Sequence, residues 1–299
     1  MRGQRYIDAI RRRLPGGAPA PAAESAPAPT TWVDTAPSPW DAATGAEVRA
    51  AAWCNICRWT GAGFDGPQHC EFATCPRCGS IARDRFLFWC FVERTPPSLR
   101  TRLLETSPRM GADYRQAMAR WFTYTCSDFD ERAHAGTVRI DLQAIDLPDA
   151  SLDVLLTPHV LEHVPETDTA LGEIARVLAP GGRMYLQVPV LQGATAPPTE
   201  PEFHGDDTPV FWRFGPDLTA RLRDHGFTTT LLCTEDWKRR VDAGDQEWGA
   251  GTSKEFDVTS LLGGSIADDL LSVADAPTAS RIGFVPSYMF LTFEAIKAQ

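Results

Sequence analysis

The sequence predicts an α/β fold, in which a mostly parallel sheet lies behind a small cysteine-based module. Three observations support this prediction. Segments typical of strands and helices alternate from about residue 100, two Cys-x-x-Cys pairs lie before that region, and an Ala/Pro-rich stretch precedes both. Alternating strands and helices favour a parallel sheet with helices on both faces. Such a sheet binds its ligands beyond the carboxyl ends of its strands.

Composition narrows the kind of protein. The formal net charge of -10 argues against nucleic acid as a partner, because a phosphate backbone attracts basic surfaces. No apolar stretch approaches the roughly 20 residues needed to span a bilayer, so no membrane association is expected. The N-terminus also lacks the apolar segment of a secretory signal. Eight cysteines then indicate a reducing, cytoplasmic compartment, where paired cysteines bind metal more often than they form disulfides.

The first 50 residues are predicted to lie outside the main domain. Residues 1–14 can form a short helix with an apolar face, either loosely attached or docking to a protein partner. Residues 15–50 are rich in alanine and proline and are predicted to act as a semi-rigid linker. Trp32 and Trp40 are expected to fix the far end of this linker to the body of the protein.

Residues 51–80 are predicted to form a zinc module. Two matched Cys-x-x-Cys pairs can present four thiolates to one ion, and the spacing between the pairs is typical of zinc ribbons. Four thiolates leave no open coordination position, so the zinc is expected to be structural; a redox dithiol is the alternative. The predicted ligands are Cys54, Cys57, Cys75 and Cys78.

Residues 81–98 are predicted to form a linking helix, and residues 99–299 the α/β domain. Its predicted strands are residues 102–107, 122–130, 137–142, 152–157, 183–190, 228–233 and 288–296, and its predicted helices are residues 113–122, 168–178 and 215–226. The helix at 168–178 is expected to end at the Ala-Pro-Gly-Gly break that follows it.

The turn LLETSPRMG, residues 103–111, follows the first of these strands and holds only one glycine. Dinucleotide sites need several glycines there, so that the backbone can approach a pyrophosphate. Ser107 and Arg109 occupy the first two glycine places, which argues against NAD and FAD. A cofactor with an amino-acid end suits the turn better, since Arg109 can bind a carboxylate and Glu105 an ammonium group.

Acids after the next two strands extend this site. Asp128 lies 23 residues beyond Glu105, a distance at which an acid commonly binds both hydroxyls of a ribose. Asp141 can accept from an adenine amino group, beside the apolar wall of Leu142. Amino acid, ribose and adenine together describe S-adenosylmethionine.

Residues 103–190 resemble the class I S-adenosylmethionine-dependent methyltransferases. The stretches IDLQAIDLPDASLDVLLTPHVLEHV and EIARVLAPGGRMYLQVP carry the resemblance: an acid after the third strand, an LPxxxxSxD stretch, an LEHV turn and an RVLxPGG break. The element CPRCGSIARDR resembles that of a bacterial subgroup with a CPxCGSxxRxR sequence upstream. The resemblance implies a Rossmann-like, seven-stranded sheet and a cofactor held by Glu105, Asp128 and Asp141. The turn departs from the family's glycine-rich pattern at two positions, which hold Ser107 and Arg109. The third position keeps the expected glycine, Gly111.

The acceptor side is predicted from histidines near the cofactor. His159 lies at the expected edge of the cofactor, and His204 lies in the aromatic-rich insertion 191–214; both are candidate general bases. His163 is expected to point back into the helix packing. A second insertion, residues 235–284, is expected to form part of the acceptor pocket or a subunit contact.

The expected activity is methyl transfer to an oxygen or nitrogen of a small molecule or peptide. Three alternatives stay open: an RNA or protein methyltransferase that grips its target with the zinc module, a non-catalytic Rossmann-like binding protein, and an enzyme that uses the same cofactor for other chemistry.

Overall fold

The computed structural model describes residues 32–34, 36–67, 72–130, 133, 137–190, 194–204, 207–215, 217–243, 267–284 and 291–299. The helix predicted at residues 1–14 and much of the insertion 235–284 lie outside the described residues. In the described part of the chain, every helix is too short or too polar to cross a bilayer.

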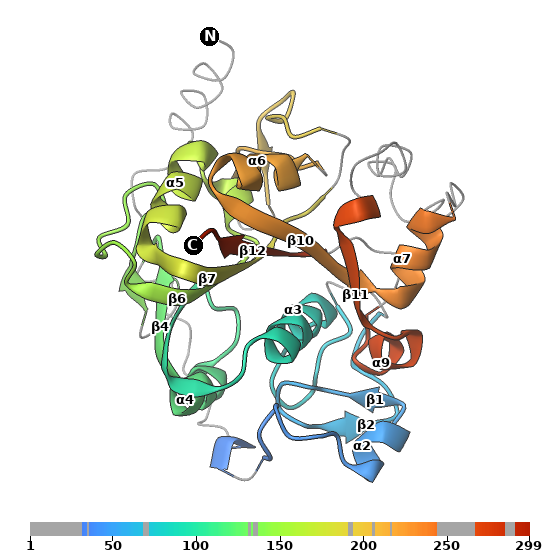
Figure 1. Ribbon diagram of the computed structural model, residues 1–299. Helices are drawn as coiled ribbons and strands as arrows, with labels where there is room; N and C mark the ends of the chain where they lie inside the picture. The colour runs from blue at the N-terminus through green and yellow to red at the C-terminus, as the bar shows by residue number, and fades with distance from the viewer. Residues whose placement is uncertain are drawn as a thin grey trace.

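A mostly parallel sheet of eight strands forms the centre of the described structure (Figure 1), in the order β11-β10-β12-β7-β6-β3-β4-β5. Only β12 runs antiparallel to its neighbours β10 and β7. The predicted mostly parallel α/β sheet is confirmed, with one strand more than the seven expected, because the insertion 235–284 adds β11 beside β10. The strands are β3 (Ser98–Thr106), β4 (Phe122–Asp128), β5 (Val138–Arg139), β6 (Leu152–Pro158), β7 (Leu178–Gln187), β10 (Phe227–Thr234), β11 (Leu270–Ala274) and β12 (Thr292–Lys297).

Two hydrophobic cores cover the two faces of this sheet. Successive residues of a strand point to opposite faces, so Leu103 of β3 packs in one core and Leu104 in the other. The helices α5 (Thr167–Val177), α6 (Leu218–Asp224) and α7 (Glu235–Asp242) contribute to the Leu104 core. The helices α3 (Ala82–Arg94), α4 (Ala112–Trp121) and α9 (Ala276–Arg281) contribute to the Leu103 core.

The Ala-Pro-Gly-Gly sequence lies inside β7, which begins at Leu178 directly after α5 ends at Val177. Gly181 has a φ of 75°, a left-handed conformation that favours glycine. A Cβ on Gly182 would lie 2.8 Å from the carbonyl oxygen of Ala179, so a side chain there would clash with the backbone. These residues form the irregularity at which the pairing of β7 with β6 shifts register.

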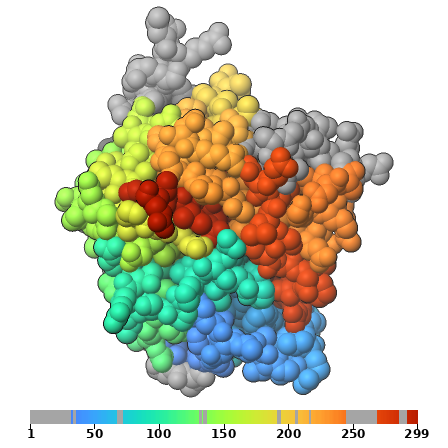
Figure 2. Space-filling view, in the orientation of Figure 1, coloured from blue at the N-terminus to red at the C-terminus, as the bar shows by residue number. Residues whose placement is uncertain are grey.

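The cysteine module packs against α3 and α9 at one side of the sheet (Figures 1 and 2). It contains the antiparallel pair β1 (Ala52–Trp53) and β2 (Thr60–Gly61). The stacked rings of Phe86 and Phe284, with centroids 4.2 Å apart, join α3 to the chain after α9. The module is thus part of the same packed body as the sheet.

Residues 36–50, here called the strap, lie within the stretch predicted as linker and pack on this body. The strap contains α2 (Gly45–Arg49), and the short helix η1 (Trp32–Asp34) precedes it. The Trp40 ring contacts Phe88 and Phe91 of α3 as well as two aromatic residues near α4, and its Nε1 donates to the carbonyl of Thr95 at 2.8 Å. Trp32 is also buried. The prediction that these two tryptophans fix the end of the linker is confirmed.

Candidate functional site

The predicted cofactor acid, Glu105, is buried near the carboxyl end of β3. Its carboxylate accepts a hydrogen bond from the Tyr124 hydroxyl at 2.7 Å and a longer one from the Tyr114 hydroxyl at 3.4 Å. Burial raises the pKa of Glu105 to about 7, while the two hydroxyls pull it the other way. The group therefore sits close to half protonated at neutral pH, held in place by tyrosines from α4 and β4.

Ser107 carries the backbone conformation for which related turns use glycine. Its φ is 46°, in the left-handed region, and its N–H donates to the carbonyl of Ser127 on the neighbouring strand at 2.7 Å. Gly111 has an ordinary φ of -68°, and a Cβ placed on it would meet open space. The turn thus needs a left-handed residue at Ser107 and accepts a serine there, whereas the retained glycine is not required by local space.

Arg109 reaches from this turn to α3. Its Nε lies 3.5 Å from Oδ1 of Asp84, whose other oxygen accepts from the N–H of Ile81 at 3.0 Å. The Arg109 side chain is 43% exposed, so its remaining donors can still reach a ligand. A small recess, partly open to solvent, lies between the turn and α3; its lining includes Glu105, Arg109, Met110, Tyr114, Asp84 and Phe88.

The two further predicted acids lie at the same edge of the sheet. Asp128 is the last residue of β4 and pairs in register with Arg139 of β5. Asp141 follows β5, and its Oδ1 accepts from the backbone N–H and the side-chain amide of Gln143 at 2.8 and 3.2 Å. The next residue, Leu142, is buried. Adjacent strands therefore bring Glu105, Asp128 and Asp141 to one edge, with Asp141 already partly used by its own turn.

A second group of polar side chains gathers beyond the carboxyl end of β6. His159 follows this strand with a φ of 53°, and its N–H donates to the carbonyl of Gln187 on β7 at 2.7 Å. The short helix η2 (Leu161–His163) comes next and supplies Glu162 and His163. His204 follows β8 (Glu202–Phe203), which pairs with β9 (Pro209–Val210). We call His159, Glu162, His163 and His204 the imidazole–carboxyl cluster.

Short separations join the members of this cluster. His159 Nδ1 lies 3.4 Å and His163 Nε2 3.9 Å from Oε1 of Glu162. The rings of His163 and His204 meet edge to face, with centroids 4.7 Å apart. The two predicted catalytic histidines therefore belong to one cluster, connected through Glu162 and His163. His163, which was expected to be a structural member of the turn, places its Nδ1 2.7 Å from the carbonyl of Pro209 on β9.

Burial sets the protonation of this cluster. It lowers the pKa of His159 well below its usual value, and the nearby charges of Arg83 and Arg109 act in the same direction. Burial also raises the pKa of Glu162 to about 8. At neutral pH His159 is accordingly a neutral base, and Glu162 carries a proton. Sequence reasoning missed Glu162, although the LEHV pattern that contains it was recognised.

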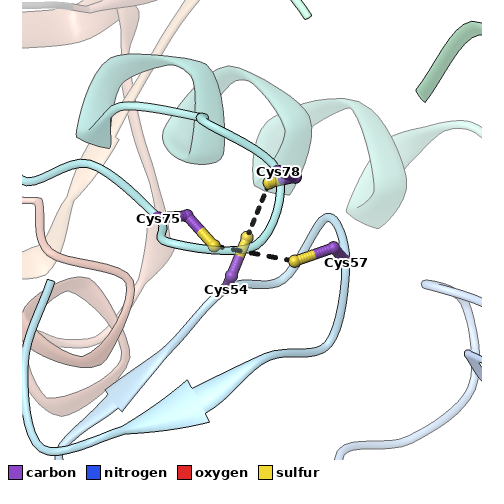
Figure 3. Close-up of side chains that lie close together, drawn as sticks. All are labelled: Cys54, Cys57, Cys75 and Cys78. Atoms are coloured by element: carbon purple, nitrogen blue, oxygen red, sulfur yellow. Dashed lines mark hydrogen bonds between the residues drawn. The ribbon is translucent and has the colours of Figure 1, made fainter. Parts of the chain in front are cut away.

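The four cysteines predicted as metal ligands converge on one point (Figure 3). Their sulfur atoms all lie within 4.8 Å of one another, and the pairs Cys54–Cys78 and Cys57–Cys75 are 3.6 Å apart. Zinc–sulfur bonds of about 2.3 Å in a tetrahedron place sulfurs about 3.8 Å apart, so the donor set fits a zinc ion. The residue after each Cys-x-x-Cys pair is left-handed: Arg58 with φ 61° and Gly79 with φ 73°.

Arg85 lies fully buried beside these sulfurs. Its guanidinium donates to the carbonyls of Ile282, Ser80 and Ala73 at 2.5 to 2.6 Å and lies 3.6 Å from the centroid of the Phe64 ring. A buried cation needs a compensating negative charge. Four thiolates around one divalent ion would carry that charge.

Comparison with known protein families identifies the part of the chain that holds this site. Residues 101–186 match the family described as a methyltransferase domain. These residues form a methyltransferase domain. The matched region runs from β3 to β7 and includes the turn after β3, both acids that follow it and most of the imidazole–carboxyl cluster. The prediction of a methyltransferase domain is confirmed for this part of the chain.

Solved structures similar to this chain share little sequence with it. A Burkholderia thailandensis 1,6-didemethyltoxoflavin-N1-methyltransferase is 14% identical with a TM-score of 0.43, and the match covers 73% of this chain and 79% of that one. A Haemonchus contortus phosphoethanolamine N-methyltransferase is 14% identical with a TM-score of 0.44, over 76% of this chain and 54% of that one. At these values the similarity says nothing about the acceptor.

Another known protein matches this chain over a short stretch. It is a 37.1 kDa protein of transposon TN4556 from Streptomyces fradiae, 43% identical over 49 residues. The match covers 16% of this chain and 14% of that protein's length.

The raised pKa of Glu105 predicts a pH-dependent stability difference between the wild type and Glu105→Gln. The pKa is about 7 in the folded protein against an ordinary value of 4.5, so the unfolded chain loses this proton first as the pH rises. Between pH 5 and 8 the wild type should therefore lose about 2 to 3 kcal/mol of unfolding free energy relative to the variant. Denaturant titrations at several pH values measure this difference. The exposed Glu200→Gln should show none, and a pH-independent difference for Glu105→Gln would contradict the assignment.

The left-handed conformation of Ser107 predicts opposite effects for two substitutions. Ser107→Val places a β-branched residue at φ 46° and should lower the free energy of unfolding by about 1 to 3 kcal/mol. Ser107→Gly relieves the conformation but gains freedom in the unfolded chain, so its stability should stay within about 1 kcal/mol of the wild type. Chemical denaturation measures the free energy of unfolding of both variants. Equal losses of this free energy in the two variants would show that the turn does not require this φ.

Proposed function

We propose that this methyltransferase transfers a methyl group to an oxygen or nitrogen atom of a small molecule or peptide bound at the imidazole–carboxyl cluster. The observation that carries the proposal is the neutral, buried imidazole of His159 at the carboxyl end of β6, beside the turn after β3. An acceptor hydroxyl or protonated amine must lose a proton before or during methyl transfer, and a neutral imidazole can take it. His204 is exposed, and its ring meets that of His163 in the same cluster.

We further propose where this chain holds its cofactor. When bound, S-adenosylmethionine supplies an electrophilic methyl group on a sulfonium sulfur. The recess between α3 and the turn suits its amino-acid end, because Glu105 and Arg109 offer an acid and a cation there. Asp128 would bind the ribose hydroxyls, and Asp141 with Leu142 would face the adenine. Ser107 supports the site through the backbone, since its conformation turns the chain from β3 toward α4.

Zinc completes the proposal in a structural role. The four buried cysteines fit the ion in number, donor type and separation, and they leave no position for a substrate. The buried Arg85 supports the same assignment, because a four-thiolate zinc centre would place further negative charge beside its guanidinium. A cytoplasmic location and a partner for residues 1–14 stay predictions from the sequence.

Cofactor binding tests the proposed site. Isothermal titration with S-adenosylmethionine and S-adenosylhomocysteine should show binding to the wild type. Asp128→Ala should weaken it about tenfold or more, because hydrogen bonds to a charged acceptor are worth about 1.5 to 3 kcal/mol. Arg109→Ala should also weaken binding, whereas Asp146→Ala, an exposed acid of the same region, should not. Unchanged affinity in both Asp128→Ala and Arg109→Ala would mean that the cofactor binds elsewhere.

Loss of a zinc ligand tests the structural centre. Cys75→Ser should reduce the zinc content measured by atomic absorption and destabilise the protein, because it leaves the Arg85 charge uncompensated at a cost of about 3 to 5 kcal/mol. The midpoint temperature of thermal unfolding should then fall by about 10 °C. The matched control Cys126→Ser changes a cysteine outside the cluster and should keep its zinc. A zinc-free wild type with unchanged thermal stability would contradict the role.

A further inference from the structure

Glu162 is a buried carboxyl group to which no other residue of the described structure gives a hydrogen bond. The residue is 1% exposed, and among the described residues neither of its side-chain oxygens has a hydrogen-bond partner. Its backbone carbonyl accepts from the N–H groups of Phe211 and Trp212 at 2.8 and 3.3 Å, which fixes the residue in place. Burying an unbonded carboxyl group costs stability, so its position calls for a role beyond packing.

Two imidazole nitrogens face the same oxygen of this group. His159 Nδ1 lies 3.4 Å from Oε1, and His163 Nε2 lies 3.9 Å from it. Both separations are longer than a hydrogen bond, and contacts of this kind commonly tighten when a substrate binds. Glu162 Oε1 therefore lies between two groups that can exchange a proton with it.

The contact with Pro209 fixes the tautomer of His163. The Pro209 carbonyl can only accept, so the Nδ1 of His163 at 2.7 Å must carry the hydrogen. Neutral His163 consequently presents the lone pair of Nε2 toward Glu162. This is the orientation needed to take a proton from the carboxyl group.

His204 continues the path to the surface. Its ring meets the His163 ring edge to face at 4.7 Å, and the residue is exposed, whereas the His159 side chain is only 8% exposed. The charged groups that act on the buried end are Arg83 of α3 and Arg109 of the turn after β3. Both are cations, and they oppose the accumulation of a proton on His159.

We propose that Glu162 is a positioning residue that relays the acceptor's proton from His159 to His163, and through His204 to solvent. The inference rests on the proposed function, in which His159 Nε2 takes a proton from the acceptor's O–H or N–H group. Glu162 Oε1 then gives its own proton to His163 Nε2 and receives the one on His159 Nδ1. This leaves His159 with its proton on Nε2 and His163 with a proton on both ring nitrogens. The acceptor gains the methyl group in place of its proton, His163 gives up one proton through His204 to solvent for each turnover, and His159 exchanges its proton from Nε2 to Nδ1 before the next.

The test uses the full chain labelled with ¹⁵N-histidine. Long-range ¹H–¹⁵N spectra between pH 5 and 9 report the tautomer and ionisation of each histidine, and the six histidines are assigned with single His→Gln variants. We expect the Nδ1–H tautomer at His163, and one transition near pH 8 that appears at both His159 and His163. Glu162→Gln should abolish this shared transition, Glu162→Asp should restore it in part, and the neighbouring exposed Glu166→Gln should leave it unchanged.

Two results would overturn the relay. One is a wild-type protein in which His159 and His163 share no transition; the other is the same transition in folded Glu162→Gln. If Glu162→Gln does not fold, His163→Gln serves instead, and an unmoved transition at His159 would then exclude the coupling. Calorimetric binding of S-adenosylhomocysteine to the same samples separates the two proposals. Binding without a shared transition overturns the relay alone, and a shared transition without binding overturns the proposed function.

Discussion

The buried guanidinium of Arg85 is the interaction on which the arrangement of this protein depends. It comes from the first turn of α3 and binds two carbonyls of the cysteine module, those of Ala73 and Ser80, and the carbonyl of Ile282 after α9. Gly283 allows the close approach, since a Cβ there would lie 2.8 Å from the guanidinium and from the Phe64 ring. One cation thus joins the module to an element of the late insertion, and the thiolates of the proposed zinc centre would supply the negative charge that offsets its burial.

Unusual backbone conformations lie where the strands of the methyltransferase domain end. Ser107 after β3 and His159 after β6 are both left-handed residues with side chains, and each donates its N–H to a carbonyl on the adjacent strand. Such conformations cost about 1 to 3 kcal/mol each and persist when neighbouring structure holds them. Here hydrogen bonds to adjacent strands of the parallel sheet hold both residues, and the two lie next to the proposed cofactor and acceptor positions. Strain is therefore placed at the edge of the sheet where the chemistry is expected.

The sequence predicted what depends on local pattern. Alternating segments indicated the parallel sheet, and the spacing of Cys54, Cys57, Cys75 and Cys78 predicted a four-sulfur cluster that the structure contains. Glu162 was missed because its isolation depends on burial by residues distant in the chain, which no local pattern reveals. The extra strand β11 was missed because a five-residue strand inside a long insertion has no helix or turn signal of its own. The docking of Trp40 was expected from the sequence, whereas the contacts of Arg58 with the strap were not, because they join residues that are distant in sequence.

The two Cys-x-x-Cys pairs of the cysteine module are not interchangeable, although each is followed by a residue in the left-handed conformation. Glycine adopts this conformation without steric cost at position 79, whereas at position 58 a residue with a side chain adopts it. That side chain, of Arg58, binds Glu47 at 2.5 Å and backbone carbonyls of the strap. Arg58 directly follows Cys57, so the side chain that holds the strap starts from the first cysteine pair. Under the proposed zinc assignment, strap docking and metal affinity would be linked through this residue, and such linkage is reciprocal. A proteolytic cut that releases the strap would then also weaken metal binding.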